Sequence, residues 1–237
     1  NSTKLDPVAI IPDHFSRPEW GKGAFTSPCS ETRKLAVKET LDMAKIAVEI
    51  GCKTISIWNG QDGFDYPFQA DYQKAHKWLV DGIRECADQY SDLTFAIEYK
   101  PKEPRNHSFV STVYSTLTLV DDINRNNVGV TIDTGHASVA YENLACSSVA
   151  AMQRGKLSHF HINDNYGFWD DDMMTGSIHT IEYIELFWWL KKIGYNGYIS
   201  VDQYPYREES LKAAQESINW LHTFDRLSDK IDSEKLQ

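Results

Sequence analysis

The stretch Val128–His136, VGVTIDTGH, decides how the rest of the chain is interpreted. Apolar residues alternate along its first half, and polar residues follow at its end. Barrel strands show this pattern where they carry polar side chains from a packed interior to the rim that holds catalytic residues. Asp133 and His136 are close enough to face one centre, and a carboxylate with an imidazole suits a divalent cation. An Asp-x-x-His at a strand end is also typical of a hydrogen-bonded turn, so the other strands must decide.

Alternating strand and helix patterns extend to both sides of this stretch. Five further strands are predicted at Val8–Ile11, Thr54–Trp58, Thr94–Glu98, Ser158–His161 and Gly197–Asp202. Helical periodicity predicts helices over Glu31–Ile50, Ala70–Tyr90, Ser111–Arg125, Tyr141–Gly155, Thr180–Ile193 and Glu208–Phe224. Such alternation predicts a parallel sheet with right-handed crossovers. We therefore predict an α/β fold, a (β/α)8 TIM barrel in which six βα units are visible and two strands are absent.

Local signals predict helix ends, buried faces and domain limits. Ser30 is the expected N-cap of the first helix, and Gly51 its C-terminal stop. The residues expected to face the core are Leu35, Leu41, Ala44 and Val48 in the first helix, Trp78, Leu79 and Ile83 in the second, and Leu211, Ile218 and Leu221 in the last. One barrel domain is predicted over residues 1–226, followed by a charged tail over 227–237.

The composition excludes several classes of protein. The chain has 237 residues, with 24 Lys and Arg against 34 Asp and Glu, and this net charge of −10 disfavours a nucleic-acid partner. The four cysteines form no Cys-x-x-Cys pair, so we expect neither a disulfide framework nor a zinc knuckle. No apolar run has the roughly twenty residues of a membrane span. We expect a cytoplasmic protein with no membrane partner and no nucleotide cofactor.

Four predicted strands end on side chains that bind metals. These strand-end residues are Glu98, Asp133, His161 and Asp202. In a parallel barrel the carboxyl ends of strands face one rim, where clustered acids repel and raise each other's pKa unless a cation lies between them. Oxygen ligands with one imidazole favour Mn²⁺, Mg²⁺ or Co²⁺. Each residue also has a simpler interpretation: Glu98 paired with Lys100 or Arg105, a buried imidazole at His161, and a turn at Asp202.

Several motifs together resemble a known family. They are Glu98–Pro104 (EYKPKEP), Asp133–His136 (DTGH), His159–His161 (HFH) and the acids Asp170–Asp172. This combination resembles the xylose isomerase-like barrel superfamily, and within it the two-metal aldose–ketose isomerases of the L-rhamnose isomerase type. The resemblance extends from Trp58 to Arg207 and makes Val8–Ile11 the third strand of eight.

The resemblance implies two metal sites. A structural ion would be held by Glu98, Asp133, His161 and Asp202. A second, catalytic ion would share Asp133 and add His136 and two acids of the loop. Asp170 and Asp172 fit the family spacing best, although three consecutive aspartates leave the register open. Mn²⁺ is the expected metal.

The resemblance also implies roles for other side chains. The expected catalytic residues are Glu98, Lys100, His136 and Asp202, and the expected substrate-binding residues are His14, Trp58, Asn163 and Arg207. Lys100 would polarise the substrate carbonyl, or it is a loop cation paired with Glu98 or Glu103. Trp58 would form an apolar wall, or it is a core residue. His14 departs from the usual spacing of a ring-opening histidine, and His159 is expected on the strand face opposite His161.

The function implied is a metal-dependent sugar isomerase that interconverts an aldose and a ketose by a metal-assisted hydride shift. One alternative is a one-metal ketose 3-epimerase, in which Glu98 and Asp202 exchange a proton, although that branch generally ends its last strand in Glu. Another is the catalytic subunit of a heteromeric lyase that cleaves C-glycosides. We expect a monosaccharide substrate. We also expect either a homo-oligomer, with Trp188, Trp189 and Trp220 at its interface, or a partner chain that completes the barrel. A barrel that only binds sugar is the non-catalytic alternative.

Overall fold

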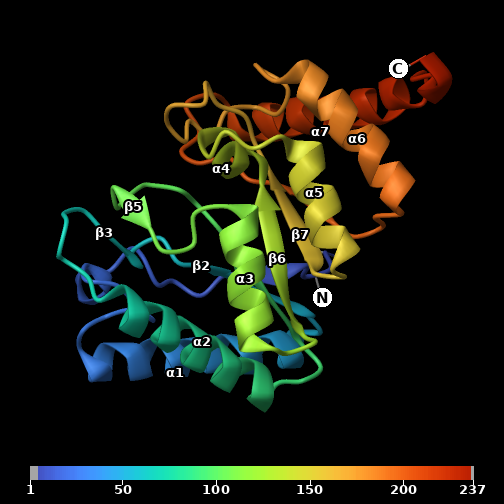
Figure 1. Ribbon diagram of the computed structural model, residues 1–237. Helices are drawn as coiled ribbons and strands as arrows, with labels where there is room; N and C mark the ends of the chain where they lie inside the picture. Colours follow the sequence, from blue (N-terminus) through green and yellow to red (C-terminus); the bar gives the residue numbers. More distant parts are fainter. Residues whose placement is uncertain (1–4, 236–237) are drawn as a thin grey trace. The chain divides into compact units, whose positions relative to one another are not determined.

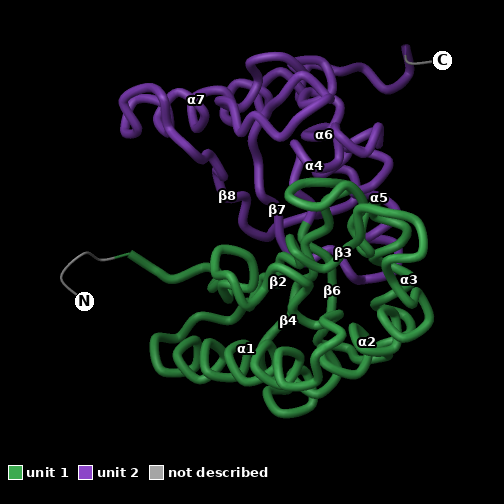
Figure 2. The backbone as a smooth tube through the Cα atoms, turned by 90° about the vertical axis from the view of Figure 1, so that its left-hand side faces the viewer, with its two compact units in different colours: residues 1–131 green, residues 132–237 purple. Residues whose placement is uncertain are grey.

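The computed structural model describes residues 5–235, which divide after Thr131 into two compact units (Figure 2). Unit 1 contains β1 (Ala9–Ile10), the short helix η1 (Pro18–Trp20), α1 (Ser30–Ile50), β2 (Thr54–Trp58), β3 (Gly63–Phe64), α2 (Tyr72–Gln89), β4 (Thr94–Glu98), β5 (His107–Ser108) and α3 (Val113–Ile123). Unit 2 contains α4 (Thr134–Val139), α5 (Leu144–Gln153), β7 (Leu157–Ile162), α6 (Thr180–Ile193), β8 (Ile199–Val201), α7 (Ser210–Ser228) and the short helix η2 (Ser233–Lys235). Strand β6 (Val128–Asp133) begins in the first unit and ends in the second.

Unit 1 is a parallel sheet covered by helices (Figure 1). Its strands follow the order β1-β2-β4-β6, with Trp58 beside Glu98 and Glu98 beside Thr131. Helices α1, α2 and α3 pack side by side, and α1 and α2 contact its strands. The strands are apolar and buried because helices cover one face and the barrel interior occupies the other. The Ser56 and Thr131 hydroxyls are 3.2 Å apart across β4, so both project from the same face.

Loops at the carboxyl end of the unit 1 strands are held by one buried acid. Asp62 accepts hydrogen bonds from the backbone N–H groups of Ala24 and Thr26, at 2.9 and 2.7 Å, and from the Asn59 amide at 3.0 Å. The two-residue strands β3 and β5 pair antiparallel beside it. This closes the loops that follow β2 and β4 into one ordered layer.

Unit 2 pairs β7 with β8 in parallel, with His161 beside Ser200. Helices α5, α6 and α7 pack in succession, α4 and α5 contact β7, and α7 contacts β8. The core contains a stack of Tyr183 on Phe224, whose ring centroids lie 5.2 Å apart. The βα pattern expected from the sequence is therefore present in both units.

Some predicted details were wrong. The helix expected over 141–155 is present as α5 but begins only at Leu144 and ends at Gln153, and the short helix α4, which begins directly after Asp133 and ends at Val139, was not predicted. The N-cap of α1 is Cys29 rather than Ser30, whereas Gly51 ends the helix with φ of 79°, as expected. His159 shares the strand face of His161, with ring centroids 5.2 Å apart. Side chains alternate along a strand, so residues two apart lie on the same side.

In two helices only part of the expected face is buried, although Ala44 of α1 is buried as predicted. Val48 of α1 is 57% exposed, and in α7 Leu211 is 74% and Ile218 40% exposed. The buried positions are instead mostly small, namely Ala36, Val37, Thr40, Ala44 and Ala47 in α1 and Ala213, Ser217, Phe224 and Ser228 in α7. Small side chains let a helix approach its neighbours closely, so size rather than hydropathy selects the contact face here.

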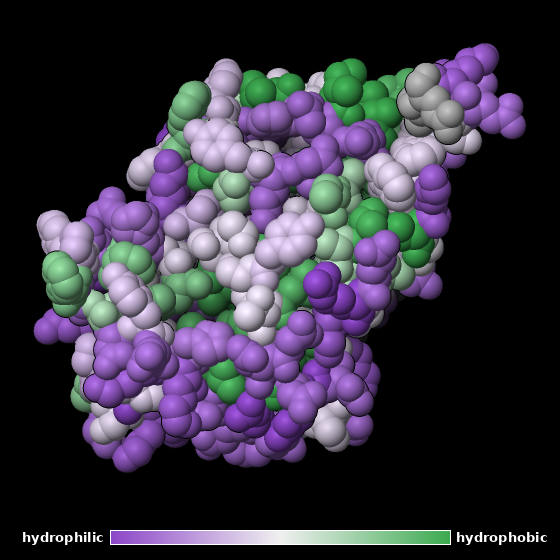
Figure 3. All heavy atoms as spheres, viewed as in Figure 1, coloured by the Kyte–Doolittle hydropathy of each residue, from purple (hydrophilic) through white to green (hydrophobic). Residues whose placement is uncertain are grey.

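The outward faces of α1 and α2 are mostly hydrophilic (Figure 3). Within residues 5–235, no helix combines the length and the apolar character that crossing a bilayer requires.

Candidate metal centre

Asp133 is the centre of the polar side chains in unit 2. It ends β6 and caps α4, where its Oδ1 accepts the His136 N–H at 2.8 Å. The Asn163 amide, which follows β7, donates to Asp133 Oδ2 at 2.9 Å. Asp133 and Asn163 are buried, so these two bonds fix the orientation of the carboxylate.

Two groups of potential ligands meet at this carboxylate. Ligand atoms of Asp133, His161 and Asp202 lie within 4.8 Å of one another, and so do ligand atoms of Asp133, His136 and Asp170. In the first group, His161 Nδ1 is 3.2 Å from Asp202 Oδ2. In the second, His136 Nε2 is 3.1 Å from Asp170 Oδ2. Carboxylates and imidazoles gathered in this way suit a divalent cation with mixed oxygen and nitrogen ligands.

Asp172 shows the electrostatic conflict in this cluster. Burial and the neighbouring charges of Asp170, Asp133 and Asp202 raise the pKa of its carboxyl from 3.8 to about 8. Its backbone is left-handed, with φ of 48°, which bends the loop between the acids. A divalent cation among these groups would offset their mutual repulsion, so the donor set fits a metal.

Gly135 is required by the close packing around Asp133. A Cβ atom at this position would lie 2.0 Å from Asn163 Oδ1 and 2.9 Å from Asn165 Nδ2. The glycine in the DTGH motif therefore admits the amide that orients Asp133.

Unit 1 places the other predicted side chains at the ends of β2 and β4. Glu98 is buried at the last position of β4. Lys100 is also buried, with its Nζ 3.3 Å from Glu103 Oε2 and 5.3 Å from the centroid of the Trp58 ring. The ion pair with Glu103 is one of the two arrangements expected for this lysine. The Trp58 ring contacts Phe15, with centroids 4.5 Å apart.

His14 lies in an apolar pocket of unit 1. Its ring packs edge-on against Trp20 and Phe25, each with centroids 5.3 Å away, and its Nε2 is 3.5 Å from the Thr40 hydroxyl. Burial lowers the pKa of this imidazole from 6.5 to about 4. His14 is therefore neutral at physiological pH, because its buried position disfavours the charged imidazolium form.

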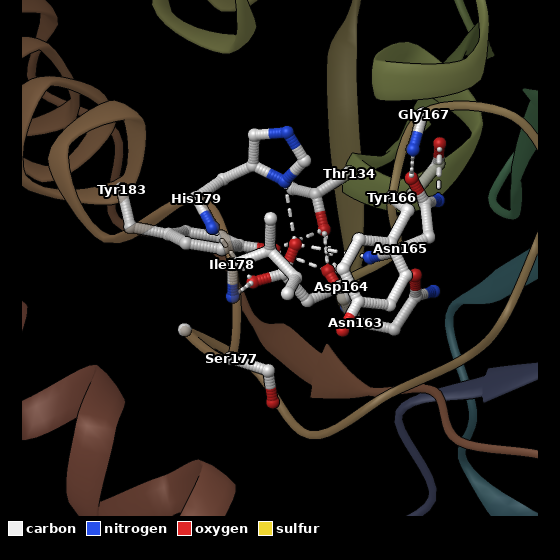
Figure 4. Close-up of polar contacts among 12 residues, drawn as sticks. Thr134, Asn163, Asp164, Asn165, Tyr166, Gly167, Ser177, Ile178, His179 and Tyr183 are labelled. Atoms are coloured by element: carbon white, nitrogen blue, oxygen red, sulfur yellow. Dashed lines mark hydrogen bonds and ion pairs between the residues drawn. The ribbon is translucent and has the colours of Figure 1, made fainter.

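The remaining predicted residues differ in exposure. Arg207 is exposed in the segment between β8 and α7. Asn163 is fully buried and engaged with Asp133, which gives it a supporting position. Sequence reasoning missed the contact between Asp164 and His179, which lie on either side of a long loop (Figure 4). The only signal was the pair of polar residues directly after β7.

Comparison with known proteins assigns the fold family. The chain matches the model of the xylose isomerase-like TIM barrel family over residues 11–224. The chain belongs to this family. The superfamily resemblance and the barrel fold class expected from the sequence are thereby confirmed. The L-rhamnose isomerase type is a finer assignment that the match does not address.

One curated relative of this chain is the xylose isomerase of Thermus thermophilus. The two are 28% identical over 215 residues, which is 88% of this chain and 56% of the relative. The chain thus spans about half the length of the curated relative that it matches.

Solved structures share the fold at lower sequence identity. A D-tagatose 3-epimerase-like protein matches with a TM-score of 0.79 and 22% identity, over 97% of this chain and 80% of its own. The apo form of 3-keto-D-glucoside 4-epimerase from E. coli matches with a TM-score of 0.76 and 20% identity, over 94% and 81%. Both likenesses concern the architecture of this xylose isomerase-like barrel.

Proposed function

We propose that this protein is a divalent-metal-dependent enzyme that isomerises a sugar. The observation that carries the proposal is the cluster of Asp133, His161 and Asp202, of which the first two are buried, with His136 and Asp170 beside it. Buried carboxylates this close together are costly unless a cation neutralises them. The family of the chain and the named activities of its relatives support a sugar as the substrate class.

Glu98 is proposed as a further ligand of the ion held by Asp133, His161 and Asp202. The support comes from strand register. Glu98 lies beside Thr131 in the parallel pair of β4 and β6. Residues paired in this way face the same side, and Asp133, two positions after Thr131, faces that side too. This register supports Glu98 as a ligand, because its carboxylate and that of Asp133 leave the same face of the strand pair.

A second ion is proposed between Asp133, His136 and Asp170, with Asp172 beside it, which favours an aldose–ketose isomerase of the two-metal type. Bound divalent cations, of which Mn²⁺ is our proposal, would supply Lewis-acid polarisation of two adjacent sugar oxygens. Asn163 would hold Asp133 in place, and Lys100 would donate a hydrogen bond to a substrate oxygen. Trp58, beside this lysine, would keep water from the reacting carbons.

A one-metal ketose epimerase is the second candidate. The side chain of Asp202 is 42% exposed, whereas those of His161 and Asp133 are 5% and 1% exposed. One carboxylate of the group is therefore open to a substrate and able to move a proton at a sugar carbon. The neighbours named as epimerases share this architecture.

An assay in heavy water separates the two reactions. Protein loaded with Mn²⁺, Co²⁺ or Mg²⁺ is incubated with a panel of aldoses and ketoses in D₂O, and the products are analysed by NMR. A hydride shift leaves the transferred hydrogen unexchanged, whereas epimerisation by proton transfer introduces deuterium at the inverted carbon. Asp133→Ala is the inactive control. Absence of bound metal after loading, or no turnover of any sugar by loaded protein, contradicts the proposed function.

We also propose that the protein assembles with other chains. A homo-oligomer through α6 and α7, or a separate chain that completes the barrel, would be detected by light scattering of purified protein and by co-purification. Trp188, Trp189 and Trp220 are partly exposed on these helices and would report an interface through their fluorescence.

A further inference from the structure

The carboxylate of Asp164 gathers four donors from two distant parts of unit 2 (Figure 4). Its Oδ1 accepts the Asn165 N–H at 3.0 Å and lies 2.6 Å from the Nδ1 of His179. Its Oδ2 accepts the backbone N–H groups of Ile178 and His179, at 2.8 and 3.0 Å. Asp164 is 2% exposed, so this single carboxylate joins the end of β7 to the start of α6 inside the protein.

The segment between these two points contains a smaller closed loop. Asp164 and Met173 exchange backbone hydrogen bonds, at 3.0 Å from the Asp164 N–H and 2.8 Å from the Met173 N–H. Residues 165–172 lie between them and include Asp170 and Asp172. Loops of this size with adjoining ends are compact units whose shape depends on how the ends are tied.

The same loop is tied to the segment that carries the other ligands. The Asn165 amide donates to the Gly135 carbonyl at 2.9 Å, between Asp133 and His136 in the chain. The Gly167 N–H in turn binds Asn165 Oδ1 at 2.8 Å. The position of Asp170 relative to His136 therefore depends on how the ends of the loop are held.

We propose that Asp164 and His179 form a clasp that positions Asp170 and thereby creates the second cation site. The inference rests on the proposed function. The clasp is a positioning device, since neither residue belongs to the two ligand groups. Closing the longer segment 165–178, which contains this loop, costs conformational entropy, and the contact between Asp164 and His179 supplies that closure before an ion binds. Loss of a residue that orients a metal ligand typically weakens metal affinity by about 10–100-fold.

The clasp acts on one site only. Asp133, His161 and Asp202 lie within one residue of the ends of β6, β7 and β8, outside residues 165–172. Their group keeps its geometry when the loop opens, whereas the group containing Asp170 does not. Loss of the contact between Asp164 and His179 should therefore weaken binding at the second cation site and leave binding at the first unchanged.

The test measures binding of Co²⁺ alone, without sugar, by isothermal titration and by equilibrium dialysis. His179→Leu removes the ring donor, whereas His179→Asn places an amide N–H near the position of the imidazole Nδ1. His76→Leu is the matched control, because His76 pairs with Asp122 at 2.8 Å on the exposed surface of unit 1. We expect His179→Leu to bind the second ion about 10–100-fold more weakly and the first as wild type does. His179→Asn and His76→Leu keep both ions.

Each result has a defined meaning. Tight binding of both ions by His179→Leu overturns the clasp, and so does an equal loss of both. If wild type binds one ion, the clasp is overturned while a one-metal function stands; if it binds none, the proposed function fails. Should circular dichroism show that His179→Leu is unfolded, Asp164→Asn decides the question, because its amide oxygen still accepts backbone N–H groups but its NH₂ group faces the ring donor. Loss of the second ion alone from that variant supports the clasp, and retention of both overturns it.

Discussion

The strand ends of the two units differ in how their charged groups are balanced. In unit 1, Lys100 pairs with Glu103 and lies near the Trp58 ring, and His14 is neutral among aromatic rings. In unit 2, acids and imidazoles lie together, and burial together with the charges of the neighbouring acids raises the pKa of Asp172. The charged groups of unit 1 are therefore paired or neutral, whereas those of unit 2 form a cluster that suits a cation.

The most demanding test of this contrast uses two buried aspartates, one from each unit. Asp133 and Asp62 are each 1% exposed, and each accepts backbone N–H groups. Asp133→Ala should abolish metal binding and lower kcat by about 10³-fold or more, because it removes a ligand shared by both sites. Asp62→Ala should lower the free energy of unfolding by about 1–3 kcal/mol and leave metal content unchanged. Elemental analysis with urea unfolding checks both, and loss of metal from Asp62→Ala contradicts the division of roles.

Gly135→Ala should have the next largest effect. The added methyl would collide with the Asn163 amide and turn Asp133 away from its ion, so metal affinity should fall by about 10–100-fold. Gly21→Ala is the control, because Gly21 has a helical φ of −58° and an added Cβ atom would lie 3.3 Å from its nearest neighbour, the Pro18 carbonyl oxygen. Competition with a fluorescent chelator measures both variants. Wild-type affinity in Gly135→Ala would show that Asn163 does not orient Asp133.

His14 predicts a pH dependence that belongs to unit 1. Its folded pKa of about 4 lies below the ordinary value of 6.5, so the unfolded chain takes up the proton first as pH falls. Stability should therefore decrease by about 3 kcal/mol between pH 6.5 and 4, and no further contribution is lost below that range. His14→Gln should remove this component of the slope in urea unfolding. Equal slopes for the two proteins contradict a buried neutral imidazole.

The smallest effect is expected at the unit 1 ion pair. Glu103→Gln should change the free energy of unfolding by about 1 kcal/mol or less, because the glutamine amide oxygen can still accept a hydrogen bond from the Lys100 ammonium group. If Lys100 acts on the substrate, Lys100→Met should lower kcat far more than Glu103→Gln does. Steady-state kinetics of the two variants separates the two roles of the lysine, and equal losses would assign Lys100 a purely structural role.

The strands were the most predictable part of the fold. The predicted limits of β2, β4 and β6 agree with the structure, because each is an apolar run bounded by turn residues or charges. Helix α4 was missed because its six residues are too few to show a helical period and follow β6 without a loop. Strands β3 and β5 are two residues each and have no periodic signal.

The candidate site was predictable at the level of ligands but not of their support. Asp133, His161 and Asp202 stood out because strand ends in parallel sheets concentrate functional residues, whereas Asp170 was a candidate only through the family resemblance. The bond from Asn163 to Asp133 joins residues 30 positions apart, and the pair of Asp164 and His179 spans 15. Such contacts form only when the chain adopts its tertiary structure, so no local sequence pattern predicts them.

The boundary between the two units lies inside β6, whose six residues are all buried. Fragments cut between Thr131 and Ile132 would each carry a frayed strand end, so they should aggregate rather than reassemble when expressed separately. A split or circularly permuted protein needs new termini in exposed chain. Tyr141, which is 82% exposed between α4 and α5, offers that place.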